Sequence, residues 1–285
     1  MVRSRSFSVF TRRFDDGIGG REPDELVVEE PMTIRLDDQP VASTMRTPGH
    51  DFELAAGFLL AEGMIEPGWI TGIRYCGTGS AVESEFNVVS VETGGRAPTP
   101  TPRLGSISAS CGLCGSEAIE GLTERLRVLP AYEPWDLELL VALPDQLRAA
   151  QTLFDATGAV HAAAAFDRSG RLLVTREDIG RHNAVDKVTG RLLLDGKLPS
   201  ANADAVPAGA VAPDLALVVS GRASFEMVQK AWVGGYTALV AVSAPSALAV
   251  TTARRAGLTV VGFARGTTAT IYSPAELVDR TSPKR

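Results

Sequence analysis

The chain has 285 residues, of which 45% are hydrophobic, 22% charged and 6% aromatic, a composition typical of a globular protein with one large or two modest domains. With 28 Lys and Arg against 34 Asp and Glu, its formal charge is -6, which argues against nucleic acid as the main partner. Three cysteines cannot form a disulfide framework and leave at least one free thiol, so we expect a reducing, cytoplasmic location.

The first third of the chain has the pattern of a β-rich region. Its N-terminus carries four arginines before Phe14, but acidic residues follow where the apolar core of a secretory signal would begin, so no signal is expected. Residues 25–36 alternate around Pro31 and residues 37–41 contain turn formers, which predicts a strand and a return. The longest apolar runs, such as residues 215–219, are far shorter than the ~20 residues of a spanning helix, so no membrane partner is expected.

The next segments lead toward a pair of cysteines. Apolar residues recur at helical spacing over residues 50–64, after a Pro-Gly breaker, which predicts an amphipathic helix. Short strands are expected at 72–75 and 87–92, and the alternating prolines of residues 94–103 predict an extended loop. In residues 107–122 two cysteines among glycines precede a helix-competent run, so we expect them on a loop or at a helix start.

From residue 137 onward, helices and strands alternate. The predicted helices are at 137–157, 183–194, 224–235 and 245–257, and the predicted strands are at 161–167, 171–175, 215–221, 238–244 and 258–264, before a last segment at 268–273. Asn183 with Asp186 resembles a helix-capping arrangement, and the Ala- and Pro-rich residues 199–213 predict a surface loop or lid.

The C-terminal alternation predicts βαβ units on a parallel sheet. Ligands of such sheets lie beyond the carboxyl ends of the strands, which here are residues 220–222, 243–245 and 263–268. The change of pattern at the proline-rich loop suggests two parts, a β-rich region with one helix (residues 1–103) and an α/β core that carries the cysteines (residues 104–285). A single integrated domain is the alternative.

Cys111 and Cys114 form a CxxC flanked by glycines, the clearest chemical motif of the chain. The glycines keep the sulfurs accessible, and the free N–H groups of a following helix lower a thiol pKa, which favours a reactive thiolate. Half of a structural zinc site is the alternative, although no second CxxC or HxxxH supports it. A thioredoxin-type oxidoreductase fits less well, because its CxxC normally follows the first strand of a short domain. The remaining candidate zinc ligands are Cys76, His50, His161 and His182.

Zinc deaminases also combine a histidine with CxxC, in a signature of HxE followed by PCxxC. Here Ala163 stands in place of the Glu and the CxxC precedes His161, so hydrolytic deamination is not expected. Residues 176–187 pack charges around one glycine at a strand-to-helix turn, for which a solvated turn is the simple interpretation. Arg222 stands at a predicted helix start, where an anionic group could bind.

Six segments follow one another in a recognisable order, at residues 46–63, 111–115, 175–187, 220–230, 242–250 and 257–266. Together they resemble the FdhD family of formate dehydrogenase accessory sulfurtransferases. The resemblance covers most of the chain from residue 46. It implies a cytidine-deaminase-like α/β sandwich core with a β-rich N-terminal region, in which the fold survives without the deaminase chemistry.

The same resemblance implies a sulfur carrier required for formate dehydrogenase activity. Such a protein accepts sulfane sulfur from a cysteine desulfurase as a cysteine persulfide and passes it to the molybdenum cofactor, bis(molybdopterin guanine dinucleotide), before insertion into formate dehydrogenase. Cys111 is the expected carrier, and Cys114 assists by exchange or release. A homodimer without a permanently bound metal is also implied. A cofactor-binding chaperone with structural cysteines is the alternative.

The cofactor in question is large and polyanionic, so arginines, backbone N–H groups and helix starts at the carboxyl edge of the sheet are suitable ligands. The resemblance points to one contact segment, residues 263–268, and the place of Arg222 at a predicted helix start adds a further arginine. The expected cofactor-binding residues are Phe263, Ala264, Arg265, Gly266, Thr267, Thr268 and Arg222.

Overall fold

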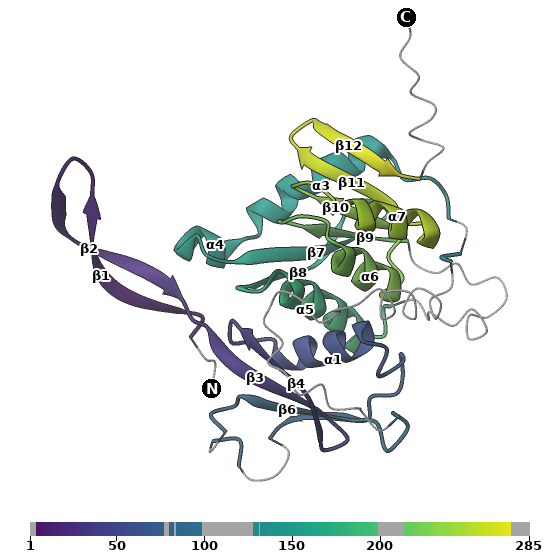
Figure 1. Ribbon diagram of the computed structural model, residues 1–285, viewed down its shortest axis with the longest axis horizontal. Coiled ribbons are helices and arrows are strands. Elements are labelled where there is room, and N and C mark those ends of the chain that lie inside the picture. The colour runs from purple at the N-terminus through teal and green to yellow at the C-terminus, as the bar shows by residue number, and fades with distance from the viewer. Residues whose placement is uncertain are drawn as a thin grey trace, which may run out of the picture.

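The computed structural model describes residues 4–76, 80–82, 84–98, 128–130, 132–198 and 214–274. These residues form a projecting hairpin, a four-stranded sheet and a six-stranded sheet with helices on both faces (Figure 1). The predicted fold class, an α/β core with a β-rich N-terminal region, is confirmed. The predicted cysteine loop, the loop at 199–213 and the domain boundary at 103/104 lie outside the described residues. No helix of the described part is long and apolar enough to span a bilayer.

Strands β1 (Ser6–Phe14) and β2 (Ile18–Val27) pair as an antiparallel hairpin that projects from the body (Figure 1). This hairpin was not predicted, because both of its faces carry exposed side chains and the usual alternation between core and solvent is absent. The hairpin therefore exposes large apolar side chains that a core would normally cover. These are Phe7, Phe10, Phe14, Ile18 and Leu26.

The four-stranded sheet has the order β4-β3-β6-β5 and packs against helix α1. Residues 28–29 separate β2 from β3, so the strand predicted over 25–36 is wrong in being continuous: its two parts belong to different sheets. The predicted return at residues 37–38 is confirmed. The bounds are β3 (Glu30–Leu36), β4 (Gln39–Arg46), α1 (Asp51–Ala61), β5 (Gly72–Tyr75) and β6 (Val88–Glu92).

The six-stranded sheet has the order β12-β11-β10-β9-β7-β8. Its strands β9, β10 and β11 are parallel neighbours, which confirms the βαβ prediction, whereas β12 and the pair β7 and β8 run antiparallel to their neighbours. The bounds are β7 (His161–Asp167), β8 (Leu172–Asp178), β9 (Leu215–Val219), β10 (Ala238–Ala241), β11 (Thr259–Arg265) and β12 (Thr268–Ser273).

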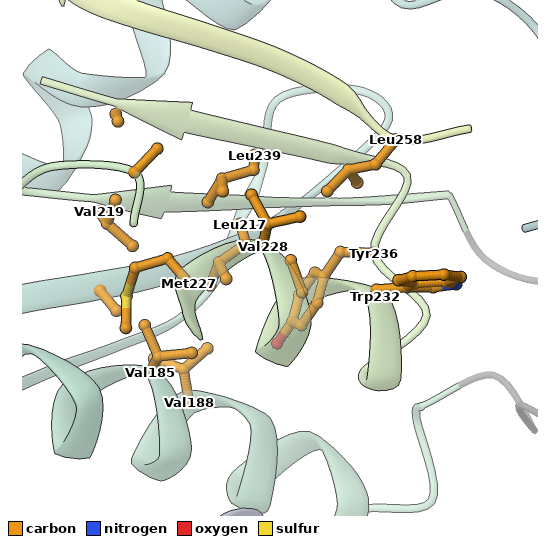
Figure 2. Packing of buried hydrophobic residues seen from close by; sticks show 14 of the residues in the cluster. Val185, Val188, Leu217, Val219, Met227, Val228, Trp232, Tyr236, Leu239 and Leu258 are labelled. Atoms are coloured by element: carbon orange, nitrogen blue, oxygen red, sulfur yellow. The ribbon is translucent and has the colours of Figure 1, made fainter. Parts of the chain in front are cut away.

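Helices cover both faces of this sheet, because its central strands are apolar on both sides. On β7, Ala162, Ala164 and Phe166 face α3 (Leu137–Ala149), and the residues between them face the other helices. The helices of this second face are α5 (Arg181–Leu194), α6 (Phe225–Val233) and α7 (Ala247–Ala256). Figure 2 shows side chains of α5 and α6, such as Val185 and Met227, beneath the strands.

The predicted helix over 137–157 is two helices, α3 and α4 (Thr152–Thr157), with a break at residues 150–151. The break is stabilised from outside, because the buried carboxylate of Glu177 accepts hydrogen bonds from the backbone N–H groups of Leu153 (2.9 Å) and Phe154 (2.8 Å). This carboxylate comes from β8 and supplies the acceptors that the carbonyl groups of a preceding helical turn would otherwise supply. The periodic pattern of residues 137–157 gives no sign of this contact.

Helix α1 lies directly against α5, so the four-stranded sheet is joined to the α/β core through a layer of helices (Figure 1). The predicted cap of α5 is wrong. Gly180 stands at its N-terminus, and Asn183 lies inside the helix, where its side-chain amide donates to the carbonyl of Met45 (2.8 Å) and to Asp178 (3.0 Å). The side chain therefore connects α5 to β4 instead of capping its own helix.

Candidate functional site

A pocket of about 620 Å³ opens at the edge of the six-stranded sheet where the parallel strands end. This is the carboxyl edge at which the sequence predicted a ligand. Ser220 follows β9, Val242 follows β10, and Ala264 and Arg265 end β11. The remaining lining residues are His161, which starts β7, and Pro144, Asp145, Leu147, Arg148, Gln151, Phe154, Gly158, Ala159 and Val160 around α3 and α4.

The end of β11 is distorted in a way that shapes the pocket. Phe263 has a φ of 53°, a strained conformation for a bulky residue, and the pairing with β12 shifts register between Gly262 and Arg265. The backbone N–H of Phe263 donates to the carbonyl of Ser243 (3.2 Å). As a result the ring of Phe263 is 48% exposed, Ala264 is buried and Arg265 lines the pocket.

His161 and the loop after β9 form another wall. The backbone N–H of Ser220 donates to the carbonyl of Ala162 (3.0 Å), and the N–H of Ala162 donates to the hydroxyl oxygen of Ser220 (2.9 Å). The His161 ring lies beside Gly221, where an added β-carbon would sit 3.7 Å from its Nδ1 atom. The loop is thus fixed to the start of β7, with the imidazole at the pocket.

The surroundings of His161 favour the neutral form of its imidazole. Burial lowers the pKa of the imidazole below the ordinary 6.5, and Arg181 and His182 lower it further, against a smaller opposing effect of Asp178. A neutral imidazole has one donor and one acceptor nitrogen.

The wall contributed by α3 and α4 combines an aromatic ring with a charged pair. The guanidinium of Arg148 lies 5.1 Å from the centre of the Phe154 ring and 2.7 Å from the carboxylate of Asp155. Gln151, between the two helices, is only 4% exposed. Because the pocket combines apolar walls and an aromatic ring with a few polar groups, it has the character of a site for a small organic ligand.

The predicted site residues are only partly brought together. Ala264 and Arg265 line the pocket, and Phe263, Gly266, Thr267 and Thr268 lie on the adjoining turn between β11 and β12. Arg222 is exposed before α6, which covers the opposite face of the sheet, and it does not line the pocket. The role of all these residues in cofactor binding stays a prediction. Cys111 and Cys114 lie outside the described residues.

Most of the pocket wall was not predicted from the sequence. His161 was considered only as a metal ligand, and the helix break that places Gln151 and Phe154 was not predicted. The position of His161 gives a usable signal, because an antiparallel strand next to β9 must begin where β9 ends. For Arg148 and Gln151 the sequence holds no comparable signal.

The charged segment 176–187 is not the solvated turn that its composition suggested. Asp178 and Lys187 are both fully buried and form an ion pair of 2.7 Å. Lys187 also donates to the carbonyl of Thr47 (2.8 Å), and Asp178 accepts from the backbone N–H of Thr47 (3.1 Å). These bonds fasten α5 to the end of β4, so the segment joins the N-terminal sheet to the core.

Two more ion pairs extend this joint. Lys230 of α6 donates to Asp186 of α5 (2.7 Å), and burial raises the pKa of Asp186 although Lys230 opposes the shift. Glu53 of α1 pairs with Arg176 of β8 (2.5 Å). Burial alone would raise the pKa of Glu53, but hydrogen bonds from Arg176 and His50 outweigh it and lower the pKa to about 2. These charges serve the packing of the helices.

Comparisons with known proteins find similarity over nearly the whole chain. A model of the FdhD/NarQ family matches residues 27–279. The sulfur carrier protein FdhD of Streptomyces avermitilis is 46% identical over 270 residues, which cover 92% of this chain and 91% of the relative. The protein of the same name from Mycobacterium tuberculosis is 43% identical over 266 residues, 90% of this chain and 92% of the relative.

A solved structure has the same fold. The crystal structure of a formate dehydrogenase accessory protein from Desulfotalea psychrophila superimposes with a TM-score of 0.73 at 24% identity, covering 96% of this chain and 99% of the other. At this level of identity the solved structure shows only that the fold is shared. The family is shown by the family model and by the more similar relatives. The chain therefore belongs to the FdhD/NarQ family.

Proposed function

We propose that this protein is a sulfurtransferase of the cytoplasm that carries sulfur to the molybdenum cofactor of a formate dehydrogenase. The observation that carries the proposal is membership of a family whose relatives are named sulfur carrier proteins, together with the intact CGLCG at residues 111–115. The carrier needs a thiolate, which a CxxC among glycines is suited to supply.

In the loading step, the thiolate of Cys111 attacks the terminal sulfur of a persulfide on a cysteine desulfurase. The sulfur–sulfur bond of the donor breaks, the donor cysteine leaves as a thiolate, and a Cys111 persulfide forms. One thiolate is consumed and one is released, so this step needs no external oxidant or reductant. The sulfur stays at the sulfane level until it is delivered.

In the delivery step, the thiolate of Cys114 attacks the inner sulfur of the Cys111 persulfide. A disulfide between the two cysteines forms, and the terminal sulfur leaves as sulfide to the molybdenum of the bound cofactor, which is a substrate here. The two cysteines supply the two electrons that reduce the sulfur. A thiol reductant must then reopen the disulfide, because otherwise the carrier stays blocked.

The pocket at the carboxyl edge is the proposed place for a guanine nucleotide end of the cofactor. Arg265 and Arg148 offer cations for phosphates, Phe154 offers a flat ring for a base, and Ala264 and Leu147 supply apolar walls. The turn with Gly266, Thr267 and Thr268 would then meet the part of the cofactor that extends from the pocket.

The partners we propose are a cysteine desulfurase as donor, a formate dehydrogenase as recipient and a second copy of the chain. A strain that lacks the gene is expected to have no formate dehydrogenase activity, which the wild type and Cys76→Ala restore and Cys111→Ala does not. Full rescue by Cys111→Ala would refute the carrier role. That result, with stoichiometric zinc in the purified protein, would favour a cofactor-binding chaperone with structural cysteines.

A further inference from the structure

Gln151 is a largely buried polar residue on the wall of the pocket. It stands at the N-terminus of α4 with backbone angles φ -87° and ψ 70°, and its side chain does not cap the helix. The residue is 4% exposed and lines the pocket. Its amide makes no hydrogen bond among the described residues and is not one of their fully buried unpaired polar groups, so it keeps access to the pocket. A polar group placed in this way on a pocket wall can fix the orientation of a ligand.

The structure also holds Gln151 in a fixed position. Its backbone N–H donates to the carbonyl of Arg148 (3.3 Å), and its carbonyl accepts from the N–H of Asp155 (3.0 Å). The next residues are fixed by Glu177, whose carboxylate accepts the N–H groups of Leu153 and Phe154. A site built on such a fixed backbone loses little entropy when a ligand binds.

The neighbours of Gln151 suit a flat ring with a polar edge. Phe154 offers an aromatic face, and the Arg148 guanidinium lies over the same ring at 5.1 Å. Pro144, Leu147 and Ala264 add apolar surface. A heterocyclic base gains from stacking on an aromatic ring, and its edge then needs hydrogen-bonding groups at the side of the pocket.

We infer that Gln151 is a specificity-determining residue that hydrogen-bonds the edge of the guanine base. This inference rests on the proposed binding of a guanine nucleotide in the pocket. The amide nitrogen of Gln151 donates to O6 of the base, and its amide oxygen accepts from N1–H. A rotated amide can instead donate to N1 and accept from N6 of adenine, so the wild-type side chain binds guanine without strongly excluding adenine.

The test measures the binding of GDP and ADP to the purified full-length protein by calorimetry. Gln151→Leu removes both hydrogen bonds and is expected to weaken GDP binding about tenfold or more. The matched control is Gln146→Leu, because Gln146 is exposed on α3 and lies outside the pocket. Gln151→Asn, which keeps the amide on a shorter side chain, provides a second variant if the leucine variant does not fold.

A further variant separates base recognition from a merely structural role. A carboxylate at position 151 accepts from both N1–H and the N2 amino group of guanine but repels N1 of adenine. Gln151→Glu is therefore expected to raise the ratio of GDP to ADP affinity several-fold, and to favour GDP over IDP, which lacks the N2 amino group. A structural residue would change the affinities for all three nucleotides alike.

The outcomes distinguish this inference from the proposed function. In one outcome the wild type and the leucine and asparagine variants bind GDP equally well, and the glutamate variant keeps the wild-type base preference. Gln151 then does not recognise the base, and only the inference about Gln151 fails. If the wild type binds neither GDP nor ADP, the nucleotide pocket itself is refuted. Weaker GDP binding in Gln151→Leu, with a changed base preference in Gln151→Glu, supports both the nucleotide pocket and the recognition of the base by Gln151.

Discussion

Gly57 of α1 and Gly190 of α5 face each other where the two helices cross. A β-carbon on Gly190 would lie 1.8 Å from the carbonyl oxygen of Glu53, and one on Gly57 would lie 2.0 Å from the carbonyl oxygen of Asp186. Both obstacles are backbone atoms, so a rotamer change cannot relieve the clash. The close crossing joins the four-stranded sheet to the α/β core, and only glycine permits it at either position.

Gly190→Ala should therefore destabilise the protein although alanine is the better helix former. We expect a loss of about 1–3 kcal/mol or more in the free energy of unfolding, because the helices must move apart. Gly20→Ala is the matched control, since Gly20 lies on the exposed hairpin with no atom within 4 Å of an added β-carbon. Urea unfolding checks this prediction, and an unchanged midpoint for Gly190→Ala would show that the helices do not pack this closely.

Glu53→Gln should reveal the ion pair between α1 and β8 as a dependence of stability on pH. The folded pKa of Glu53 is about 2, below its ordinary 4.5, so its stabilising contribution is complete above about pH 4.5 and is lost as the pH falls toward 2. We expect the variant to lose about 1.5–3 kcal/mol at pH 7 and distinctly less at pH 3. Equal losses at both pH values, measured by urea unfolding, would contradict the ion pair.

Glu177→Ala should loosen α4 and the pocket wall that it carries. Without the carboxylate, the N–H groups of Leu153 and Phe154 lose their acceptor, so their hydrogen exchange should accelerate about tenfold or more. Binding of GDP should also weaken in this variant, because Phe154 of α4 lines the pocket. The control is Glu138→Ala, on the exposed side of α3. Unchanged exchange at residues 152–157 would mean that Glu177 does not stabilise this helix.

Arg265→Ala and Arg222→Ala should differ in their effect on nucleotide binding. Arg265 lines the pocket and Arg222 does not, although both were expected as ligands of the cofactor. We expect Arg265→Ala to weaken GDP binding about tenfold, as the loss of a charged hydrogen bond does, and Arg222→Ala to change it less than twofold. Calorimetry in low salt measures this difference. An equal loss in both variants would place the phosphates outside the pocket.

Much of the core was predictable because its sequence pattern has a local cause. The alternation of strands and helices after residue 214 marks parallel strands buried on both faces, and it was confirmed. The hairpin β1 and β2 was missed since neither face is buried, and the helix break before α4 was missed since Glu177 acts from a distant strand. Such contacts between distant segments leave no periodic signal.

The site was predictable only to the extent that topology determines it. Parallel strands end at one edge, so Ala264 and Arg265 were expected beside a ligand, and both line the pocket. The strongly charged segment 176–187 suggested a solvated turn, but Asp178 and Lys187 are buried against each other. A sequence shows charges without showing what pairs with them, which is why a structural joint resembled an exposed turn.

The most direct test of the sulfur carrier is the mass of the intact protein after incubation with a cysteine desulfurase and cysteine. The proposal predicts a gain of one sulfur, about 32 Da, in the wild type, in Cys76→Ala and in Cys114→Ala, and no gain in Cys111→Ala. A gain that persists in Cys111→Ala, or no gain in any form, would contradict the assignment of Cys111 as the carrier.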